Sequence, residues 1–575
     1  MSSQRFGLVV AASLVGACVL IGGLVGRPDF GGFTSGTSSE AAGHIEAAVD
    51  EAMGVVRDNY ADEIEFEKVN QSAVQGMLST LDPHSNFFTP AEYQKLLQDQ
   101  DSSFIGIGVN ILRHRDGVYV QSAVEGTPAA RAGLRFGDRI VEVDGKDARE
   151  WTTQQVSTAV RGPRGERVTL QVERAGASTP LTFTVVRASV PLPSIRSSFM
   201  IRPGTGYVAL TGGFTHTTAE ELEEALAALR REGMRQLVLD LRNNPGGLLD
   251  QSISVAGQFL PRGATVVSVR GREEAQQKTY RNVISDPVDY PLVVLINRNS
   301  ASASEIVEGA IQDHGRGLVV GETSFGKGLV QRLFPLPYGA GLTLTTAKYY
   351  TPYGRLIQRD YSAGSLYDYY IRHDPEDEPQ PEQPGRPSQV APPNSAVVNP
   401  TPEPTPRPTP PRGTPSVEAA GGRVFYGGGG ITPDVEVKPL DASSPTRARI
   451  FEASFYFTRQ LVGGLVVGLE SYRVDEPQYG RYPRPTDFPV NDRVLEAFRA
   501  YVRRDPESGL TPAQIDADLE YVRARLRDDL ATAAYGTGAG TRTLLDTDPQ
   551  LLRALEVLPE AKRLAENVGR SGTLN

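Results

Sequence analysis

Residues 291–331 read PLVVLINRNSASASEIVEGAIQDHGRGLVVGETSFGKGLVQ, and this stretch decides the interpretation of the fold. The apolar run Leu292–Ile296 predicts a buried strand, and Leu318–Gly321 predicts a second one. Between them, apolar residues recur at helical spacing and predict a helix that ends at Gly315; they are Ile306, Val307, Ala310 and Ile311. Strand, helix and strand in this order are typical of a parallel sheet covered by helices.

The Ser/Ala-rich turn before this helix places Ser302 at the helix N-terminus. Free backbone N–H groups and the helix dipole can stabilise a developing oxyanion there, as an acyl-transfer nucleophile requires. Lys327 follows between two glycines. A lysine has a pKa of ~10.4 in water, so it acts as a base near neutral pH only if burial lowers that pKa by ~3 units. If Lys327 begins a strand, Gln331 lies on the same face and its amide would orient the amine.

Two other sites compete for the same residues. Residues 321–327 fit the first seven positions of a P-loop, but Gly328 stands where Ser or Thr would reach Mg²⁺, and the next residues predict a strand. His314 beside Asp313 offers a Ser-His-Asp arrangement, but both residues lie at the far end of the helix from Ser302, and the chain has no G-x-S-x-G elbow. A serine that only caps the helix and a lysine on the surface also remain open at this point.

Composition limits the class of protein. The 575 residues carry a formal charge of −10, so no basic stripe is available for nucleic acid. At ~150 residues per domain, the length predicts three or four domains. The single cysteine, Cys18, excludes a disulfide framework and a multi-cysteine metal site. The six histidines form no HExxH pair. We therefore expect no metal and no cofactor.

The N-terminus predicts the compartment. An apolar run, residues 6–26, follows Arg5 and ends at Arg27. At ~1.5 Å per residue, it is just long enough to cross a membrane. Residues 1–27 are interpreted as an uncleaved signal anchor, favoured because the run continues past Cys18, or as a lipoprotein signal with residues 15–18 as its lipobox. Either interpretation places the rest of the chain outside the cytoplasm, in the bacterial periplasm or cell envelope, attached to the membrane.

Composition and periodicity divide the remainder. After a linker at 28–39, helical spacing predicts an N-terminal helical domain at 40–102, in which Thr89 caps a helix beginning at Pro90. A period of two predicts a β-rich domain at 103–187. Alternating strands and helices predict an α/β core at 188–373 and 423–442, interrupted by a Pro-rich, disordered insertion at 374–422. Residues 443–575 predict a helical region. The clearest strands are expected at 118–120, 139–143, 168–172, 237–241 and 291–297, with a turn at Asp144 and Gly145.

Several ordered motifs resemble the carboxyl-terminal processing peptidases, or tail-specific proteases, over roughly residues 45–440. They are the serine turn at 299–305, the lysine segment at 321–331, and residues 81–85, 104–108, 240–247, 349–354 and 430–434. The resemblance implies an α/β multidomain fold with an N-terminal helical segment, an inserted β-rich PDZ domain, a ClpP/crotonase-like α/β peptidase core and a helical C-terminal tail.

By the same resemblance, the chain is a serine endopeptidase with Ser302 as nucleophile and Lys327 as base. Gln331 would orient the lysine. The oxyanion hole would use the backbone N–H groups of Ala303 and of either Gly246 or Gly247, between which the sequence does not decide. A vestigial core that serves as a non-catalytic PDZ scaffold is the alternative, and it predicts loss of Ser302 or Lys327, both of which are present.

The PDZ resemblance predicts how substrates are recognised. Residues 126–130 and 132–140 carry it. A PDZ groove adds a peptide as a strand and captures the terminal carboxylate in a backbone nest. The nest is expected at Phe104, Ile105, Gly106, Ile107 and Gly108, with Ile105 and Ile107 as pocket walls. Substrates would be unfolded or tail-exposed proteins with apolar C-termini. An activating adaptor or lipoprotein and a homodimer through the terminal helices are further hypotheses.

Overall fold

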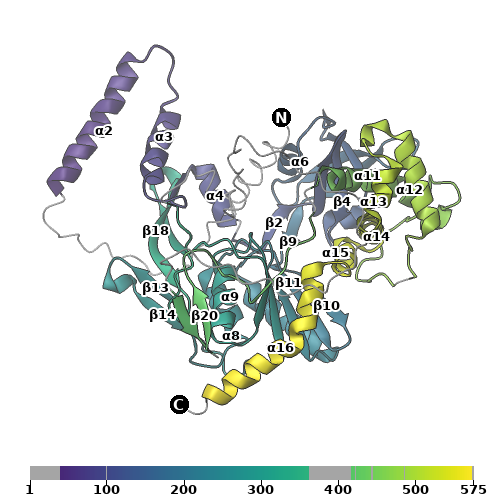
Figure 1. Cartoon of the computed structure of the whole chain (residues 1–575). Helices are drawn as coiled ribbons and strands as arrows, with labels where there is room; N and C mark the ends of the chain where they lie inside the picture. The colour runs from purple at the N-terminus through teal and green to yellow at the C-terminus, as the bar shows by residue number, and fades with distance from the viewer. Residues whose placement is uncertain are drawn as a thin grey trace, which may run out of the picture.

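A computed structural model describes residues 39–98, 100–361, 369, 416–420, 422–441, 444–484 and 486–572 (Figure 1). The predicted membrane anchor with Cys18, and most of the Pro-rich insertion, lie outside these residues. Within the described part of the chain, no helix combines the length and the apolar character needed to span a membrane.

The centre of the molecule is a six-stranded sheet in which β10 is antiparallel to β11 and the remaining neighbours are parallel. Its strands, in spatial order, are β10 (Ile195–Arg202), β11 (Thr205–Leu210), β12 (Gln236–Asp240), β15 (Leu292–Ile296), β16 (Leu318–Gly321) and β21 (Val435–Glu436). All residues of β15 and β16 are buried, because helices cover both faces of the sheet. The strands predicted at 237–241, 291–297 and 318–321 are confirmed.

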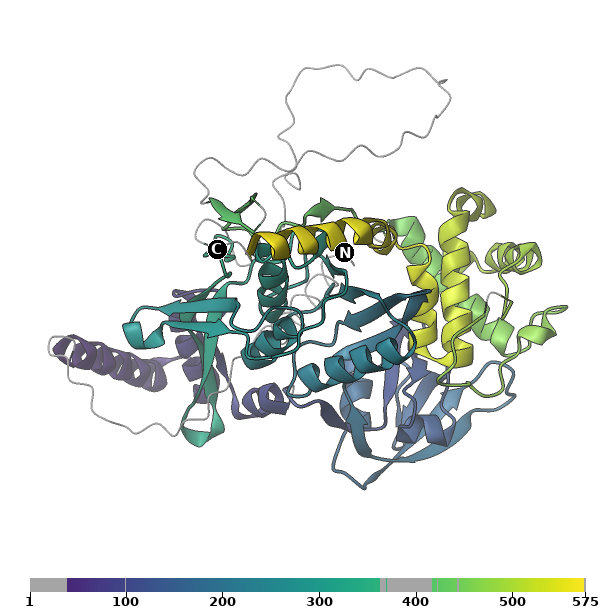
Figure 2. The ribbon, with the colours of Figure 1, turned by 90° about the horizontal axis from the view of Figure 1, so that it is seen from below.

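Helices pack on both sides of this sheet (Figure 2). One face is covered by α7 (Thr218–Arg231), α8 (Leu249–Gly257) and α9 (Ala303–Asp313). The other face is covered by α16 (Pro549–Gly572), whose Leu551, Leu555 and Leu558 pack against strand residues such as Val293 and Leu295. The carboxyl ends of β12 and β15 lead into the turns that carry the candidate site.

A second, five-stranded sheet stands beside the first. It contains β1 (Asn86–Phe88), β13 (Thr265–Gly271), β14 (Lys278–Arg281), β17 (Leu329–Pro335) and β18 (Gly341–Tyr350), with short 3-10 turns at Glu274–Gln276 and Pro337–Gly339. The N-terminal segment supplies β1, which pairs with β18. The helix α4 (Pro90–Gln98) follows, and Thr89 caps it as predicted, because Thr89 and Glu92 exchange hydrogen bonds.

Two helices precede this sheet, α2 (Ser39–Asn59) and α3 (Phe66–Ser79), and α2 stands away from the rest of the chain (Figure 1). Apolar side chains on α2 remain exposed: Ile45 is 64% and Val49 54% exposed.

The β-rich domain has the sheet order β3-β4-β5-β7-β8, with β6 paired to β5. Its elements are β3 (Val109–His114), β4 (Gly117–Ala123), α5 (Pro128–Ala132), β5 (Arg139–Val143), β6 (Lys146–Asp147), α6 (Thr153–Val160), β7 (Arg167–Glu173) and β8 (Leu181–Val186). The predicted strands and the turn are confirmed, and both turn residues have positive φ, 47° for Asp144 and 78° for Gly145. A separate ribbon of β2 (Ser103–Gly106) and β9 (Ala188–Pro191) carries the chain into and out of the domain.

The C-terminal region is a packed helical domain rather than a tail. It comprises α11 (Pro445–Val462), α12 (Asp492–Arg504), α13 (Pro512–Ala517), α14 (Leu519–Tyr535), α15 (Thr537–Leu545), α16 and short 3-10 turns at Glu470–Tyr472 and Pro506–Ser508. Val494, Phe498 and Val502 of α12 enter its core, as their helical spacing suggests.

The disordered insertion predicted at 374–422 extends too far. Within it, β19 (Ser416–Ala419) pairs with β20 (Arg423–Tyr426) in a hairpin. Ala419 is buried, and the N–H of Ala420 donates to the Asp313 carbonyl at 3.1 Å, so this end of the insertion is anchored on α9.

Candidate active site

Ser302 lies at the N-terminal end of α9, in the turn that connects β15 to this helix. Its backbone has φ 56° and ψ −111°, a conformation that costs free energy in a non-glycine residue and persists only where neighbours impose it. The neighbours do so through hydrogen bonds. Ser300 Oγ donates to the Leu241 carbonyl at 2.8 Å, and the Ala301 N–H donates to the Asn244 carbonyl at 3.0 Å.

The turn after β12 lies against this serine. A Cβ atom added to Gly246 would stand 2.8 Å from Ser302 Cβ, and one added to Gly247 would stand 2.2 Å from the Phe214 carbonyl oxygen. Both positions also have positive φ, 95° and 150°. Sterics and backbone conformation therefore both require glycine here. The Gly246 N–H is already used, because it donates to Asn244 Oδ1 at 2.9 Å.

Lys327 is the buried basic residue of the site. Its side chain is among the largest fully buried ones of the described residues, with 1% exposed. Glycines flank it for steric reasons: Cβ atoms at Gly326 and Gly328 would meet neighbouring backbone at 3.0 and 2.7 Å. Burial in general disfavours the charged form of an amine, which is the direction that a general base requires.

Glu305, one turn into α9, joins the serine and the lysine. Its fully buried carboxylate accepts four hydrogen bonds. Oε2 accepts from the N–H groups of Ser302 and Lys327, both at 2.8 Å. Oε1 accepts from the Gly326 N–H at 2.7 Å and from Ser324 Oγ at 2.6 Å. Burial raises the pKa of the Glu305 carboxyl, and these four hydrogen bonds oppose the rise. The backbones of the two candidate catalytic residues thus share one acceptor oxygen.

A wall of polar and aromatic side chains lies near the lysine, formed by His84 of the N-terminal segment together with Tyr369 and Gln358 from the chain after β18. His84 Nε2 lies 2.9 Å from Tyr369 Oη, and Gln358 Nε2 donates to the same oxygen at 3.0 Å. Gln358 Oε1 in turn accepts the Gly328 N–H at 2.8 Å. Burial holds the pKa of His84 well below its usual value, because it disfavours the charged ring. The ring is therefore uncharged.

The premise of the periodicity argument for Gln331 does not hold, because Lys327 lies two residues before β17 instead of inside it. The pairing of β17 with β18 shifts register between Val330 and Gln331, with the extra residue, Thr346, in β18. The role of Gln331 in orienting the lysine stays a prediction. The Gln331 amide donates to Thr345 Oγ1 at 3.3 Å.

The competing sites lack their structural context. A strand rather than a helix follows Gly328, so the P-loop arrangement is absent. His314 lies at the C-terminal end of α9 and contacts the Thr265 carbonyl at 2.7 Å, while Asp313 pairs with Arg355. Among the described residues, no group of three or more His, Cys, Asp or Glu side chains is arranged to hold a metal ion.

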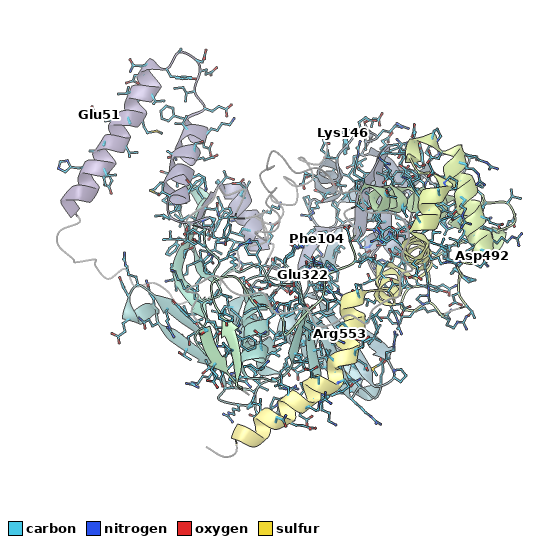
Figure 3. The ribbon with its side chains drawn as sticks, viewed as in Figure 1. Glu51, Phe104, Lys146, Glu322, Asp492 and Arg553 are labelled. Carbon is cyan, nitrogen blue, oxygen red and sulfur yellow. The ribbon has the colours of Figure 1, made fainter. Side chains whose placement is uncertain are left out.

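The residues predicted to form the carboxylate nest lie in β2 and in the link from β2 to β3. Phe104, Ile105 and Gly106 belong to β2, whose backbone pairs with β9, and Phe104 lies where the β-rich domain meets the α/β core (Figure 3). Ile107 is 1% exposed and belongs to the core of the β-rich domain, whereas Ile105 is half-buried. Only the end of the loop, with Gly108 at φ 82°, forms a turn.

One edge of the β-rich domain's sheet has no neighbouring strand among the described residues. β3 is an edge strand of the described sheet, with β4 on one side only. The guanidinium of Arg161, at the end of α6, lies 4.8 Å above the Phe104 ring.

Sequence reasoning did not single out Glu305, Asn244 or His84 as site residues. Glu305 gave a usable signal, since a residue three positions after the N-cap of a helix faces the N-terminus and the residues held there. His84 lies in the motif at 81–85, but its place in the site depends on Tyr369, which is distant in sequence.

Comparisons with known proteins fit this arrangement. Residues 204–370 match the family model of peptidase family S41, and residues 119–174 match that of the PDZ domain. A carboxy-terminal-processing protease of Bartonella bacilliformis is 38% identical over 308 residues, or 53% of this chain and 70% of that protein. Carboxy-terminal processing protease CtpB of Bacillus subtilis is 32% identical, over 54% of this chain and 65% of that protein. A solved photosystem II D1 C-terminal processing protease shares 30% identity over 56% of this chain and 91% of that one, with a TM-score of 0.32.

The fold and these matches define a serine protease with a PDZ domain ahead of its peptidase domain. The chain belongs to the carboxy-terminal processing proteases of peptidase family S41.

Proposed function

We propose that the protein is an endopeptidase in which Ser302 is the nucleophile and Lys327 the general base. The observation that carries the proposal is the shared carboxylate: Ser302 N–H and Lys327 N–H both donate to Glu305 Oε2 at 2.8 Å, so the fold brings a strained serine and a buried lysine to one point. A serine needs an adjacent base to attack a carbonyl, and a dehydrated amine is such a base.

The reaction then has two halves. Ser302 Oγ bonds to the scissile carbonyl carbon while its proton passes to the neutral Lys327 Nζ. The C–N bond breaks, and the leaving amine takes that proton from the lysine. Water then attacks the ester, giving one proton back through Lys327 to Ser302 Oγ, and the new C-terminal carboxylate is released.

Backbone donors would stabilise the oxyanion of each tetrahedral intermediate. The N–H of Ala303, in the first turn of α9, has no partner inside the helix. On the opposite side, Gly246 already donates to Asn244, so we assign the second donor to Gly247.

We propose that the PDZ domain selects substrates by their C-terminal tails. A tail would pair with the free edge of β3 beside α6, its carboxylate would lie at the turn around Gly108, and Arg161 would supply a positive charge there. Substrates would be unfolded or tail-exposed proteins, because an extended strand is the form this edge accepts.

Location and further partners are proposed from two apolar segments of the chain. The apolar run at 6–26 supports a membrane-anchored protein of the periplasm or cell envelope. The exposed apolar face of α2, with Ile45 and Val49, supports a homodimer through the terminal helices. An activating adaptor or lipoprotein stays a hypothesis.

The experiment compares the parent chain with Ser302→Ala and Lys327→Ala on an unstructured protein substrate that ends in an apolar tail. We expect cleavage by the parent only, and slower cleavage when the tail is amidated. Unchanged cleavage by Ser302→Ala would refute the mechanism. A chain that binds the tail but never cleaves it would favour the non-catalytic scaffold.

A further inference from the structure

The PDZ domain is joined to the peptidase core by a narrow ribbon. β2 brings the chain in and β9 takes it out, and among the described strands these two pair only with each other. Ser102, just before β2, anchors the ribbon to the core through Thr215 and Thr217, at 3.0 and 2.6 Å between hydroxyl oxygens. A two-stranded ribbon alone would let the domain rotate about this point.

The C-terminal helices remove that freedom from the other side. Phe455 of α11 inserts between PDZ side chains: its ring stacks on His114 with centroids 3.7 Å apart and meets Tyr119 and Phe136 at 5.2 Å each. Tyr119 and Phe136 are buried, as members of the same core as the C-terminal helices. The PDZ domain and the helical region therefore share one hydrophobic core, which independently moving domains do not.

Polar contacts surround this shared core. Glu452 Oε2 lies 2.7 Å from His114 Nδ1, and its other oxygen accepts the Arg115 N–H at 3.0 Å. Arg459 donates to the Gly137 carbonyl at 2.6 Å and to the Glu173 carbonyl at 2.9 Å. Such bonds fix orientation as well as distance, because their donors and acceptors are rigid backbone and buried side chains.

The same helical region is fixed to the peptidase core at its far end. α16 covers the central sheet, and Arg242 of the turn beside Ser302 donates to Asp548 Oδ2 at 2.6 Å and to Gln550 Oε1 at 2.9 Å. One end of the C-terminal region thus holds the PDZ domain, and the other holds a turn of the active site. In both views of the ribbon, α11–α15 lie beside the PDZ strands and α16 extends along the core (Figures 1 and 2).

We propose that residues 444–572 form a brace that holds the PDZ domain at one distance and angle from Ser302. The contacts of α11 use the β3–β4 turn and the residues before β5, and the proposed peptide groove lies elsewhere, between β3 and α6. The braced groove sets a minimum length for the tail between the bound C-terminus and the scissile bond. Tails shorter than this threshold bind but are not cut. The inference rests on the proposed function and adds a spacing rule to it.

A disulfide between the PDZ domain and the brace tests whether the PDZ domain stays in one position during cleavage. Ser122 Oγ of β4 and Thr537 Oγ1 of α15 lie 2.5 Å apart, so Ser122→Cys with Thr537→Cys places two sulfur atoms within bonding reach. A Cys18→Ser background leaves no other cysteine. The oxidised and reduced forms are then compared in their cleavage of a series of substrates whose tails lengthen by one residue at a time.

We expect the same kcat/KM within twofold and the same threshold length in both forms. A loss of tenfold or more on oxidation, reversed by reduction, would show that the PDZ domain must move and would overturn the brace. Absence of any threshold would overturn it as well.

A second measurement does not depend on cleavage. Hydrogen exchange at residues 114–123 and 450–460 is followed in the parent chain while an apolar-tailed peptide saturates the PDZ domain. We expect unchanged protection at this interface, and faster exchange there would overturn the brace. A parent chain that does not cleave but keeps this protection would count against the proposed function alone. Arg459→Ala, which removes two contacts outside both the catalytic site and the groove, is expected to make the threshold less sharp.

Discussion

Replacing Glu305 by glutamine tests the shared carboxylate with the smallest change of shape. The carboxylate accepts four hydrogen bonds, two at each oxygen. An amide has one acceptor oxygen and one donor group. If its NH₂ faces Ser302 and Lys327, both backbone N–H groups lose their acceptor. If it faces Gly326 and Ser324, one N–H group and one hydroxyl lose theirs.

The expected cost follows from these two arrangements. Each buried N–H group without an acceptor costs about 1–3 kcal/mol, and the surviving bonds weaken because the acceptor is no longer charged. We therefore expect Glu305→Gln to destabilise the peptidase core by about 2–5 kcal/mol. The serine and lysine backbones would also shift, and a displacement of about 1 Å costs roughly 100-fold in rate.

Glu308→Gln is the matched control, one turn further along α9. Glu308 is fully buried, and both of its oxygens lack a hydrogen-bond partner among the described residues. Burial, and then the charge of Glu305, raise the pKa of Glu308 well above its usual value, so the side chain is neutral and an amide replaces it at little cost.

The assay combines thermal unfolding, kcat and the affinity for an apolar-tailed peptide. For Glu305→Gln we expect a lower melting temperature and about 100-fold lower kcat, with unchanged peptide affinity because the PDZ groove is elsewhere. If Glu305→Gln matches the parent in both stability and kcat, the carboxylate does not hold the site together. Equal losses in both variants would point to the helix and not to this carboxylate.

Three further outcomes are expected. The folded pKa of Glu308 is raised, so its stabilising effect is present below about pH 4.5 and is lost as pH rises. Glu308→Gln should therefore unfold at a higher temperature than the parent at pH 9 but not at pH 4. Equal pH profiles of the two melting temperatures would contradict this. Gly246→Ala should abolish cleavage because its Cβ would stand 2.8 Å from that of Ser302. The control Gly354→Ala, with a similar φ of 92° and no atom within 4 Å of the added Cβ, should only lower the melting temperature slightly. Similar activities of the two variants would show that the close approach of Gly246 to Ser302 is unimportant. Asp548→Asn removes the charge that pairs with half-buried Arg242 and should lower kcat about tenfold, an effect of about 1.4 kcal/mol, at unchanged KM. A change in KM alone would place the effect in substrate binding.

The sequence predicted the parts of the fold that depend on local pattern. The continuous apolar runs of β15 and β16 and the helical spacing on α9 and α12 are properties of neighbouring residues, so the sequence alone is enough to identify them. The glycines at 246 and 247 were visible as a motif, but the reason for them was not. That reason is the approach of Ser302 and Phe214 from other parts of the chain.

Features that depend on tertiary pairing were missed or wrong. The periodicity argument for Gln331 assumed that Lys327 begins the strand, but β17 begins two residues later, at Leu329. The helices after residue 444 were expected, but nothing in their apolar faces identifies the PDZ domain as their partner. Phe455 has the same spacing whether it packs within its own domain or against Tyr119.

The pairing of β1 with β18 has a practical consequence for dissecting the enzyme. Asn86 pairs with Thr343, and Thr343 Oγ1 donates to the His84 carbonyl, so the N-terminal segment is part of the peptidase sheet. A fragment that starts where the family match starts, at residue 204, would keep Ser302 and Lys327 yet lose His84, β1 of the five-stranded sheet and β10 of the central sheet. The smallest piece that folds as a working protease must therefore begin before the PDZ domain, and the PDZ domain is an insertion within it that cannot be trimmed away from one end.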